Sequence, residues 1–165
     1  MALHDHCSHC GAAFAQGAPW PRICTACGET TWRNPLPVAV ALLPVDTDHG
    51  RGLVLVRRDI EPMRGELGLP GGFIEVGEAW REATVRELRE ETTIEADAAD
   101  VELFDVHSAA SGTLLVFGLL PPRPLADLPP SVRTEESLGY EIALEARELC
   151  FPTHTAAMAR YFASA

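Results

Sequence analysis

Three glutamates lie close together in residues 86–92, RELREET, and could bind a divalent metal ion. In a helix, residues three and four apart are neighbours, so Glu87 would lie beside both Glu90 and Glu91. Like charges at this spacing destabilise a helix by about 0.2–0.5 kcal/mol per pair. A hard cation such as Mg²⁺ prefers oxygen ligands and would turn the repulsion into binding. The alternative is an acidic helix face exposed to water, which the three residues alone favour.

Four of the five cysteines form two similar pairs that could bind a different metal. Cys7 and Cys10 stand in CSHCG, Cys24 and Cys27 stand in CTACG, and thirteen residues separate the pairs. This spacing is typical of a zinc ribbon, in which four thiolates surround Zn²⁺ tetrahedrally. Two disulfides are the alternative, but they require an oxidising compartment, and we find no signal for secretion.

A shell of four thiolates has no open position for water, so this Zn²⁺ would stabilise structure and perform no catalysis. Three histidines crowd the first cysteine pair: His4, His6 and His9. One of them could replace a cysteine, but four cysteines already complete the shell, so we expect the histidines to be exposed or beside the ligands. Cys150 is alone and is expected to be a small buried apolar residue.

The composition is that of a globular protein, with 47% apolar and 22% charged residues in a chain of 165. The net charge of −11 disfavours binding to long nucleic acid. A small phosphorylated substrate is still allowed, because a bound metal can reverse the local field. No run of 18 apolar residues predicts a membrane span. The first ten residues, MALHDHCSHC, lack a basic and then apolar signal, so we predict a cytoplasmic location.

The order of the predicted elements indicates how the glutamates are positioned. Residues 1–34 are expected to form the zinc ribbon and residues 35–165 a second domain, joined by WRNPLP at 32–37. The second domain alternates strands with helices, which predicts an α/β sandwich around a mixed sheet. The predicted strands are 38–45 and 53–58, as a hairpin, then 101–108 and 113–120. The predicted helices are 79–92 and 152–162, the latter with Thr153 as its N-cap.

A glycine-rich loop comes before the acidic helix. LPGG at 69–72 would let the backbone approach a ligand, and its carbonyls could complete the oxygen shell of a metal. On a helical wheel the glutamates form a stripe beside the flank best suited to burial, which carries Leu88 and Thr92. We therefore expect the glutamates at the edge of a cleft.

Residues 72–94 resemble the Nudix box, G-x5-E-x7-R-E-U-x-E-E-x-G-U, in which U is aliphatic. Eight of the nine specified positions match: Gly72, Glu78, Arg86, Glu87, Leu88, Glu90, Glu91 and Ile94. The departure is Thr93, where the family has a glycine that ends the helix in the left-handed conformation. A β-branched residue would resist that conformation, so we expect an altered helix end. The metal carboxylates precede it, so we expect activity to survive.

The resemblance implies a Nudix-type α/β/α sandwich around a mixed sheet, with a small N-terminal zinc ribbon. It implies hydrolysis of a nucleoside diphosphate linked to another moiety, with Mg²⁺ or Mn²⁺. Glu87 and Glu91 would be metal ligands, Glu90 would be a ligand or a base acting through water, and Gly72 would add a carbonyl oxygen. Arg86 and Glu78 would brace the loop against the helix. Arg86 would also belong to the catalytic residues. Many Nudix enzymes dimerise, so a homodimer is expected by resemblance alone.

The family often has a further acidic residue in a loop beyond the box. RTEESLGYE offers Glu135, Glu136 and Glu141, and we select Glu136 because ESL before an aromatic residue resembles the family's placement. An exposed acidic loop is the alternative. The strand expected before ELCFPTH is barely visible in the sequence, which leaves the identity of the general base open.

The ribbon, the box and the closing FPTH resemble small ribbon-Nudix hydrolases similar to plant chloroplast FAD pyrophosphohydrolases, which also act on ADP-ribose. The resemblance favours FAD or ADP-ribose as substrate, with release of AMP. The alternatives are an NADH pyrophosphatase, whose SQPWPFPxS-type signature is absent, a nucleoside triphosphate pyrophosphohydrolase, and a nucleotide-sensing module without catalysis. The intact glutamates argue against a sensor. Candidates for stacking on a base, or for packing alone, are Trp20, Trp32, Trp80 and Phe117.

Overall fold

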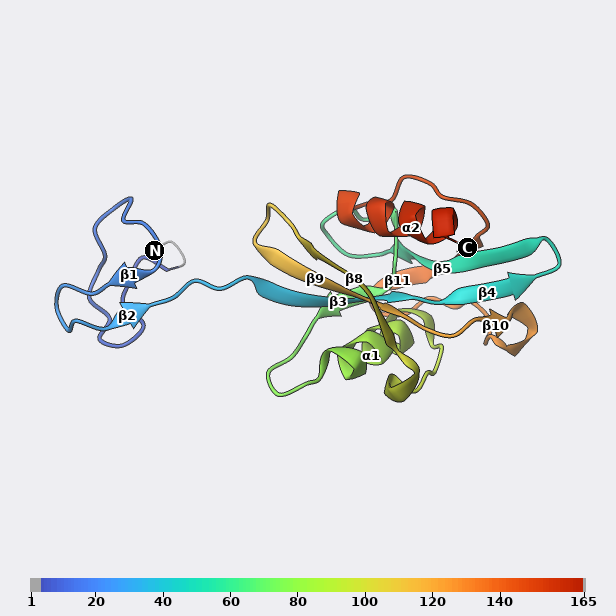
Figure 1. The fold of residues 1–165 in the computed structure, drawn as a ribbon, viewed down its shortest axis with the longest axis horizontal. Coiled ribbons are helices and arrows are strands. Elements are labelled where there is room, and N and C mark those ends of the chain that lie inside the picture. Colours follow the sequence, from blue (N-terminus) through green and yellow to red (C-terminus); the bar gives the residue numbers. More distant parts are fainter. Residues whose placement is uncertain (1–3, 165) are drawn as a thin grey trace. The chain divides into compact units, whose positions relative to one another are not determined.

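The computed structural model describes residues 4–164, and the chain divides after Pro35 into two compact units. The predicted boundary lies one residue earlier. The first unit contains a two-stranded antiparallel sheet of β1 (Arg22–Ile23) and β2 (Thr30–Thr31). The second unit contains the remaining strands and both α-helices (Figure 1).

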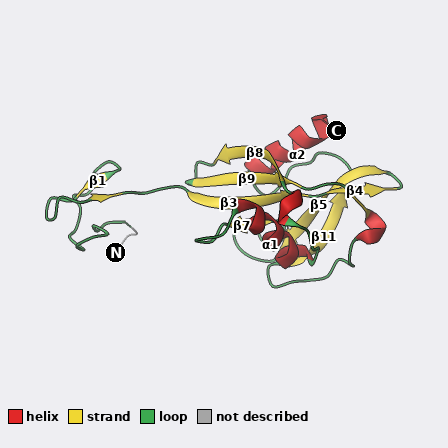
Figure 2. Ribbon diagram, turned by 60° about the horizontal axis from the view of Figure 1, so that its bottom comes forward, coloured by secondary structure: helices red, strands yellow, loops and turns green. Residues whose placement is uncertain are grey.

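Two sheets form the centre of the second unit (Figure 2). The five-stranded sheet contains β10 (Arg123–Pro124), β4 (Pro44–Thr47), β5 (Gly50–Arg58) and β11 (Ser137–Ala143) in this order, with β6 (Leu67–Gly68) also paired to β5. The four-stranded sheet contains, in order, β7 (Gly71–Phe73), β3 (Leu36–Leu42), β9 (Thr113–Leu119) and β8 (Glu102–Ser108). Both sheets are mixed, because β3 runs parallel to β9 and β4 runs parallel to β10 while the other pairs are antiparallel.

The helices α1 (Trp80–Thr92) and α2 (Pro152–Ser164) cover opposite faces of the sheets (Figure 1). Successive side chains of a strand point to opposite faces, and β5 follows this rule. Leu53 and Leu55 belong to the core cluster that includes Met158 of α2. Val54, between them, belongs to the cluster that includes Leu88 of α1. The predicted α/β/α sandwich is confirmed. Short 3₁₀ helices lie at Ala98–Asp100 and Leu125–Asp127. No helix in residues 4–164 is both long and apolar enough to cross a bilayer.

Three local predictions were wrong. The predicted strand 38–45 is divided between the two sheets, because Pro44 has no N–H to continue the pairing of β3. Thr153 is not the N-cap of α2, since the helix begins with Pro152, a residue well suited to the first helical position. The strand that is barely visible before ELCFPTH exists as β11, which pairs with β5 along its length.

The end of α1 also differs from the prediction. Thr93 adopts the left-handed conformation, with φ of 63°, and its N–H donates to the carbonyl of Arg89 at 2.7 Å. The helix therefore ends as it would with glycine, and the expected alteration does not occur. Left-handed backbone costs an ordinary residue about 1–2 kcal/mol, so the strain is held in place by the surrounding contacts.

Replacement of the exposed Thr93 by glycine is expected to raise the free energy of unfolding by about 0.5–1 kcal/mol, because glycine adopts this conformation without strain. The gain is smaller than the strain, since glycine also gives the unfolded chain more freedom. Thermal denaturation followed by circular dichroism measures it. Thr93→Ala keeps the strain and is the control, so a glycine variant no more stable than the alanine variant would contradict this account.

Candidate active site

Helix α1 presents two acidic side chains to the interior of the protein. Glu87 is 7% exposed and Glu91 is 3% exposed, while Leu88 and Thr92 of the same helix are fully buried. The sequence predicted these glutamates beside the flank best suited to burial, at the edge of a cleft, and it did not predict that Glu87 and Glu91 are themselves buried. The helical wheel placed them correctly relative to Leu88, but it could not show that the glycine loop covers them.

The Glu87 carboxylate lies directly against the backbone of Gly72. A Cβ atom built on Gly72 would be 2.5 Å from Oε1 of Glu87, so no larger residue fits unless the carboxylate moves. Gly72 pairs with Ala39 in the β7–β3 ladder, which fixes the position of its backbone. The structure thus brings the predicted Gly72 and Glu87 together, at a distance that only glycine permits.

The Glu91 carboxylate is held by the same loop. Its Oε2 accepts a hydrogen bond from the N–H of Gly71 at 3.0 Å. The Ser137 hydroxyl at the start of β11 donates to the backbone carbonyl of Glu91 at 2.6 Å. Glu91 is therefore held by β7 at its carboxylate and by β11 at its backbone.

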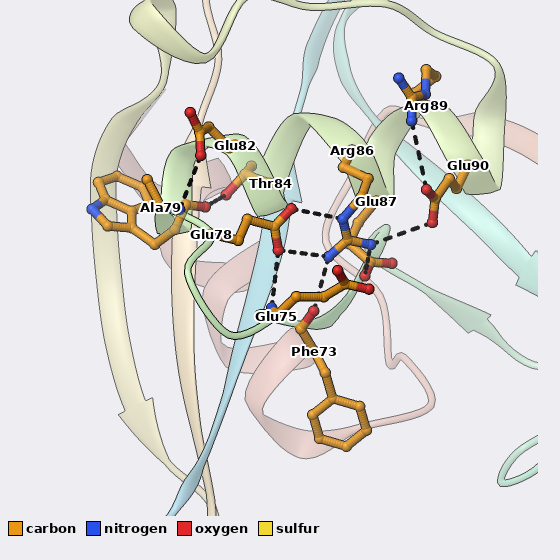
Figure 3. Close-up of polar contacts among 11 residues, drawn as sticks. Phe73, Glu75, Glu78, Ala79, Glu82, Thr84, Arg86, Glu87, Arg89 and Glu90 are labelled. Carbon is orange, nitrogen blue, oxygen red and sulfur yellow. Dashed lines mark hydrogen bonds and ion pairs between the residues drawn. The ribbon is translucent and has the colours of Figure 1, made fainter.

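Arg86 connects the loop to the helix, as Figure 3 shows. Its guanidinium donates two hydrogen bonds to the Glu78 carboxylate, at 2.7 and 3.0 Å, and a third to the Phe73 carbonyl at 2.9 Å. It also donates to Oε1 of Glu87 at 2.6 Å. The bonds to Glu78 contribute most to raising the pKa of Arg86 and to lowering that of Glu78, so both groups stay charged. The predicted bracing pair has the geometry for that role.

Burial makes ionisation of the two inner glutamates unfavourable. It raises the pKa of Glu91 to about 8, opposed by the hydrogen bond from Gly71 and reinforced by the charge of Glu87. Burial also raises the pKa of Glu87, although the bonds from Arg86 oppose it. A divalent cation would reverse both effects, because it favours the ionised form.

The third glutamate of the box lies in a different environment. The side chain of Glu90 is 50% exposed and is 3.3 Å from Arg86 and 3.6 Å from Arg89. Within residues 4–164, the carboxylate oxygens of the box do not gather as tightly as the four cysteine sulfurs do. Nη1 of Arg86 donates to both Glu87 and Glu90, so the guanidinium partly neutralises these two carboxylates. Mg²⁺ keeps several of its own waters, so it does not require a complete cage of protein oxygens.

Glu136, the residue selected beyond the box, lies near the inner pair. It is exposed and immediately precedes β11, and its charge contributes to raising the pKa of both Glu87 and Glu91. Glu141, one of the other candidates, instead pairs with Arg57 and Arg147. The charge of Glu136 at the inner pair, and the engagement of Glu141 with two arginines, favour Glu136 over Glu141.

Two residues near the site were missed by sequence reasoning. Arg58 ends β5 and is half-buried, with its guanidinium 5.3 Å from the centre of the Phe151 ring, and its charge lowers the pKa of Glu91. His154 of α2 accepts a hydrogen bond from the N–H of Leu69 at 3.2 Å and so supports the glycine loop. Burial lowers the pKa of His154 to about 3, so it is neutral. The paired arginines at 57–58 and the histidine in FPTH were the available signals.

The aromatic candidates for base stacking have different surroundings. Phe117 is fully buried in the core, so of its two predicted roles the structure supports packing. Trp80 packs partly against the core cluster on the α1 side. In the first unit, Trp20 lies against the guanidinium of Arg22 at 4.3 Å, and Trp32 is 65% exposed.

The four paired cysteines have the geometry of a zinc site. Their sulfur atoms all lie within 4.8 Å of one another, with 3.8 Å between Cys7 and Cys27 and 3.6 Å between Cys10 and Cys24. Zn–S bonds of about 2.3 Å in a tetrahedron imply S···S distances of about 3.8 Å, so Zn²⁺ fits here and disulfides do not. Hydrogen bonds from the backbone of Cys10 and His9 lower the pKa of Cys7 to about 6, which favours the thiolate that binds metal. The three nearby histidines are exposed, as expected: His4, His6 and His9.

The purified protein is expected to contain about one equivalent of zinc per chain, measured by inductively coupled plasma mass spectrometry. Chelation or the Cys24→Ser substitution should unfold the first unit, because so short a segment buries too little apolar surface to fold without metal. Substitution of Cys150, which is buried in the second unit and is not one of the four clustered cysteines, is the control and should leave the zinc content unchanged. A metal-free protein whose first unit stays folded would contradict this prediction.

The family model for the NUDIX domain matches residues 35–149, more than half of the chain. The chain belongs to the NUDIX family. The predicted family resemblance and the Nudix-type fold are confirmed. The match covers the glycine loop, α1 and β11, and therefore all the candidate metal-binding residues of the second unit.

This NUDIX chain is similar to several known proteins. It is similar to an ADP-ribose pyrophosphatase of Methanocaldococcus jannaschii, with 50% identity over 40 residues, 24% of each protein. It is also similar to the NAD-capped RNA hydrolase NudC of Edwardsiella ictaluri, with 29% identity over 93 residues, 56% of this chain and 34% of that protein. The solved NUDIX hydrolase of Nitrosomonas europaea has a TM-score of 0.71 and 26% identity, and the match covers 97% of this chain and 91% of that one.

The two sequence matches thus span a quarter and a third of the relatives' own lengths. They leave most of each relative unmatched.

Proposed function

We propose that this NUDIX protein hydrolyses the pyrophosphate of a nucleoside diphosphate linked to another moiety, with Mg²⁺ or Mn²⁺. The observation that carries the proposal is the pair of buried carboxylates, Glu87 and Glu91, against the backbone of Gly71 and Gly72. Two buried acidic groups with raised pKa values destabilise a fold at neutral pH, so their presence indicates a functional role. Metal binding explains the residue type, the burial and the absence of a side chain at Gly72.

The residues of the candidate site would have different roles in this hydrolysis. Glu87, Glu91 and the carbonyl of Gly72 would hold the divalent ions, with Glu90 at the exposed side. When bound, such ions neutralise the pyrophosphate charge and lower the pKa of a water molecule to near neutrality. Glu136, which is exposed just before β11, would accept the proton of that water. Arg86 and Glu78 hold Glu87 and the loop in place.

ADP-ribose or FAD is the proposed substrate, with AMP as one product. The 50% identity to an ADP-ribose pyrophosphatase lies within a short segment, so it supports the ADP-linked class without selecting one compound. The match to NudC keeps NADH and NAD-capped RNA as a second candidate class. The missing tryptophan- and proline-rich signature argues against NADH. The net charge of −11 argues against NAD-capped RNA, because it disfavours binding to long nucleic acid.

A substrate panel tests the proposal directly. Full-length protein with Mg²⁺ or Mn²⁺ is incubated with ADP-ribose, FAD, NADH, NAD-capped RNA and nucleoside triphosphates, and products are separated by ion-exchange chromatography. We expect AMP from ADP-ribose or FAD with a kcat/KM at least about tenfold above that of NADH, a difference of about 1.4 kcal/mol. No turnover of any compound would favour a nucleotide-sensing module instead. The homodimer and the cytoplasmic location stay predictions.

A further inference from the structure

Asp59, just after β5, is a buried acidic residue that the proposed chemistry does not use. Its side chain is 5% exposed and binds two arginines that are themselves mostly exposed, Arg64 and Arg133. Arg64 donates from Nε at 2.9 Å and from Nη2 at 2.6 Å to Oδ1, while Nη2 of Arg133 donates to Oδ2. The bond from Arg64, and then the charges of both arginines, lower the pKa of Asp59, so this carboxylate is ionised.

The two arginines come from different parts of the chain. Arg64 belongs to the segment that connects β5 to β6 and is only five positions from Asp59. Arg133 belongs to residues 129–136, the segment that ends with Glu136. The backbone of Asp59 contacts this segment too, because its N–H donates to the Glu136 carbonyl at 2.8 Å. Asp59 therefore holds the Glu136 segment by its side chain and by its backbone.

The other contacts of residues 129–136 are of a different kind. Ser131 bonds to Tyr140, and Thr134 bonds to Ser137, so these contacts tie the segment to β11, into which it leads. Among the described residues, the pair with Asp59 is the one ion pair that any residue of 129–136 makes. This ion pair links residues 129–136 to the end of β5, whereas the contacts of Ser131 and Thr134 link them to β11.

We propose that Asp59 is a positioning residue that holds Glu136 beside Glu87 and Glu91, with Arg133 as the link. This inference rests on the proposed function, since it assigns the position of Glu136 a role in hydrolysis. Small displacements of a catalytic group reduce rates strongly, about a hundredfold for 1 Å in sensitive cases. Asp59 would act on the rate through Glu136 and would not touch the substrate.

The chain provides a matched control. Arg64 and Arg133 bind the same carboxylate, but Arg133 alone belongs to the Glu136 segment. We expect Asp59→Asn and Arg133→Gln each to lower kcat about tenfold with little change in KM, and Arg64→Gln to stay within about twofold of the wild type. Equal increases of KM in both arginine variants would overturn the inference and indicate that the arginines bind an anionic group of the substrate.

Combination with Glu136→Gln separates positioning from a general loss of stability. If Asp59 acts through Glu136, Asp59→Asn has no further effect on kcat once Glu136 is replaced. If the two effects multiply, Asp59 acts by another route and the inference fails.

Hydrogen exchange gives a readout that does not depend on activity. Amides of residues 131–137 should exchange faster in Asp59→Asn and Arg133→Gln than in Arg64→Gln, because only the first two release the segment. Unchanged exchange in all three variants would overturn the inference even in an active enzyme. A wild type that hydrolyses no compound of the panel would instead overturn the proposed function, and a finding of faster exchange would still establish that Asp59 holds the segment.

Discussion

Replacement of Glu91 by glutamine is expected to lower kcat at least about a thousandfold, because a ligand of the metal ions that activate water and neutralise the pyrophosphate is lost. Glutamine has the size of glutamate but lacks its charge, so the fold is preserved. Glu87→Gln should have an effect of similar size. Rates are measured with saturating Mg²⁺ on the best compound of the substrate panel.

The same substitution is expected to stabilise the metal-free protein. The pKa of Glu91 is raised from 4.5 to about 8 by burial, so its contribution to stability is complete below pH 4.5 and is lost as the pH rises through about 8. Glutamine removes this loss, which is of the order of 1–3 kcal/mol at pH 8. The midpoint of thermal unfolding in EDTA should therefore rise, and rise more at pH 8 than at pH 5.

Glu95→Gln is the matched control, because Glu95 is exposed and lies just beyond the helix. It should change neither the rate nor the stability. An inactive Glu91→Gln protein that is also less stable in EDTA would show that Glu91 is a structural residue. A variant that keeps the wild-type rate would remove the case for a metal site at Glu91.

Replacement of Gly72 by alanine is the second large effect that we expect. The new Cβ would be 2.5–2.6 Å from the carboxylate atoms of Glu87, which is closer than real Cβ contacts. The carboxylate of Glu87 must therefore move, and in this buried site the movement breaks its hydrogen bond of 2.6 Å from Arg86. We expect kcat/KM to fall about a hundredfold and the Mg²⁺ concentration for half-maximal rate to rise.

A double substitution shows whether this steric contact is the cause. Glu87→Asp shortens the side chain and leaves room for the new Cβ at position 72. The Gly72→Ala and Glu87→Asp variants are compared singly and together, and we expect the double variant to lose less than the product of the single losses. Purely multiplicative losses would mean that Gly72→Ala acts elsewhere, for example by distorting β7.

The sequence was sufficient for the parts of this protein that depend on local spacing. The cysteine pairs, and helix α1 within one residue at its start, follow from local spacing. The pairing of Arg86 with Glu78 was implied by the resemblance to the Nudix box. These features depend on turns and on neighbours in one helix, which a single sequence records well.

The parts that could not be predicted depend on contacts between distant segments. The burial of Glu87 and Glu91 arises from β7, whose glycines allow the backbone to pass directly over the carboxylates. A helical wheel shows which residues share a face but not what covers that face. The role of Asp59 likewise depends on Arg133, which lies 74 positions away in the sequence.

Anomalous diffraction from crystals soaked with Mn²⁺ and a slowly hydrolysed nucleotide tests the central claim most directly. We predict manganese peaks about 2.1 Å from carboxylate oxygens of Glu87 and Glu91, with the carbonyl of Gly72 among the ligands. Glu90 should approach the ions from the exposed side. Crystals with nucleotide bound and no manganese at Glu87 or Glu91, at a Mn²⁺ concentration that supports full turnover in solution, would contradict the account.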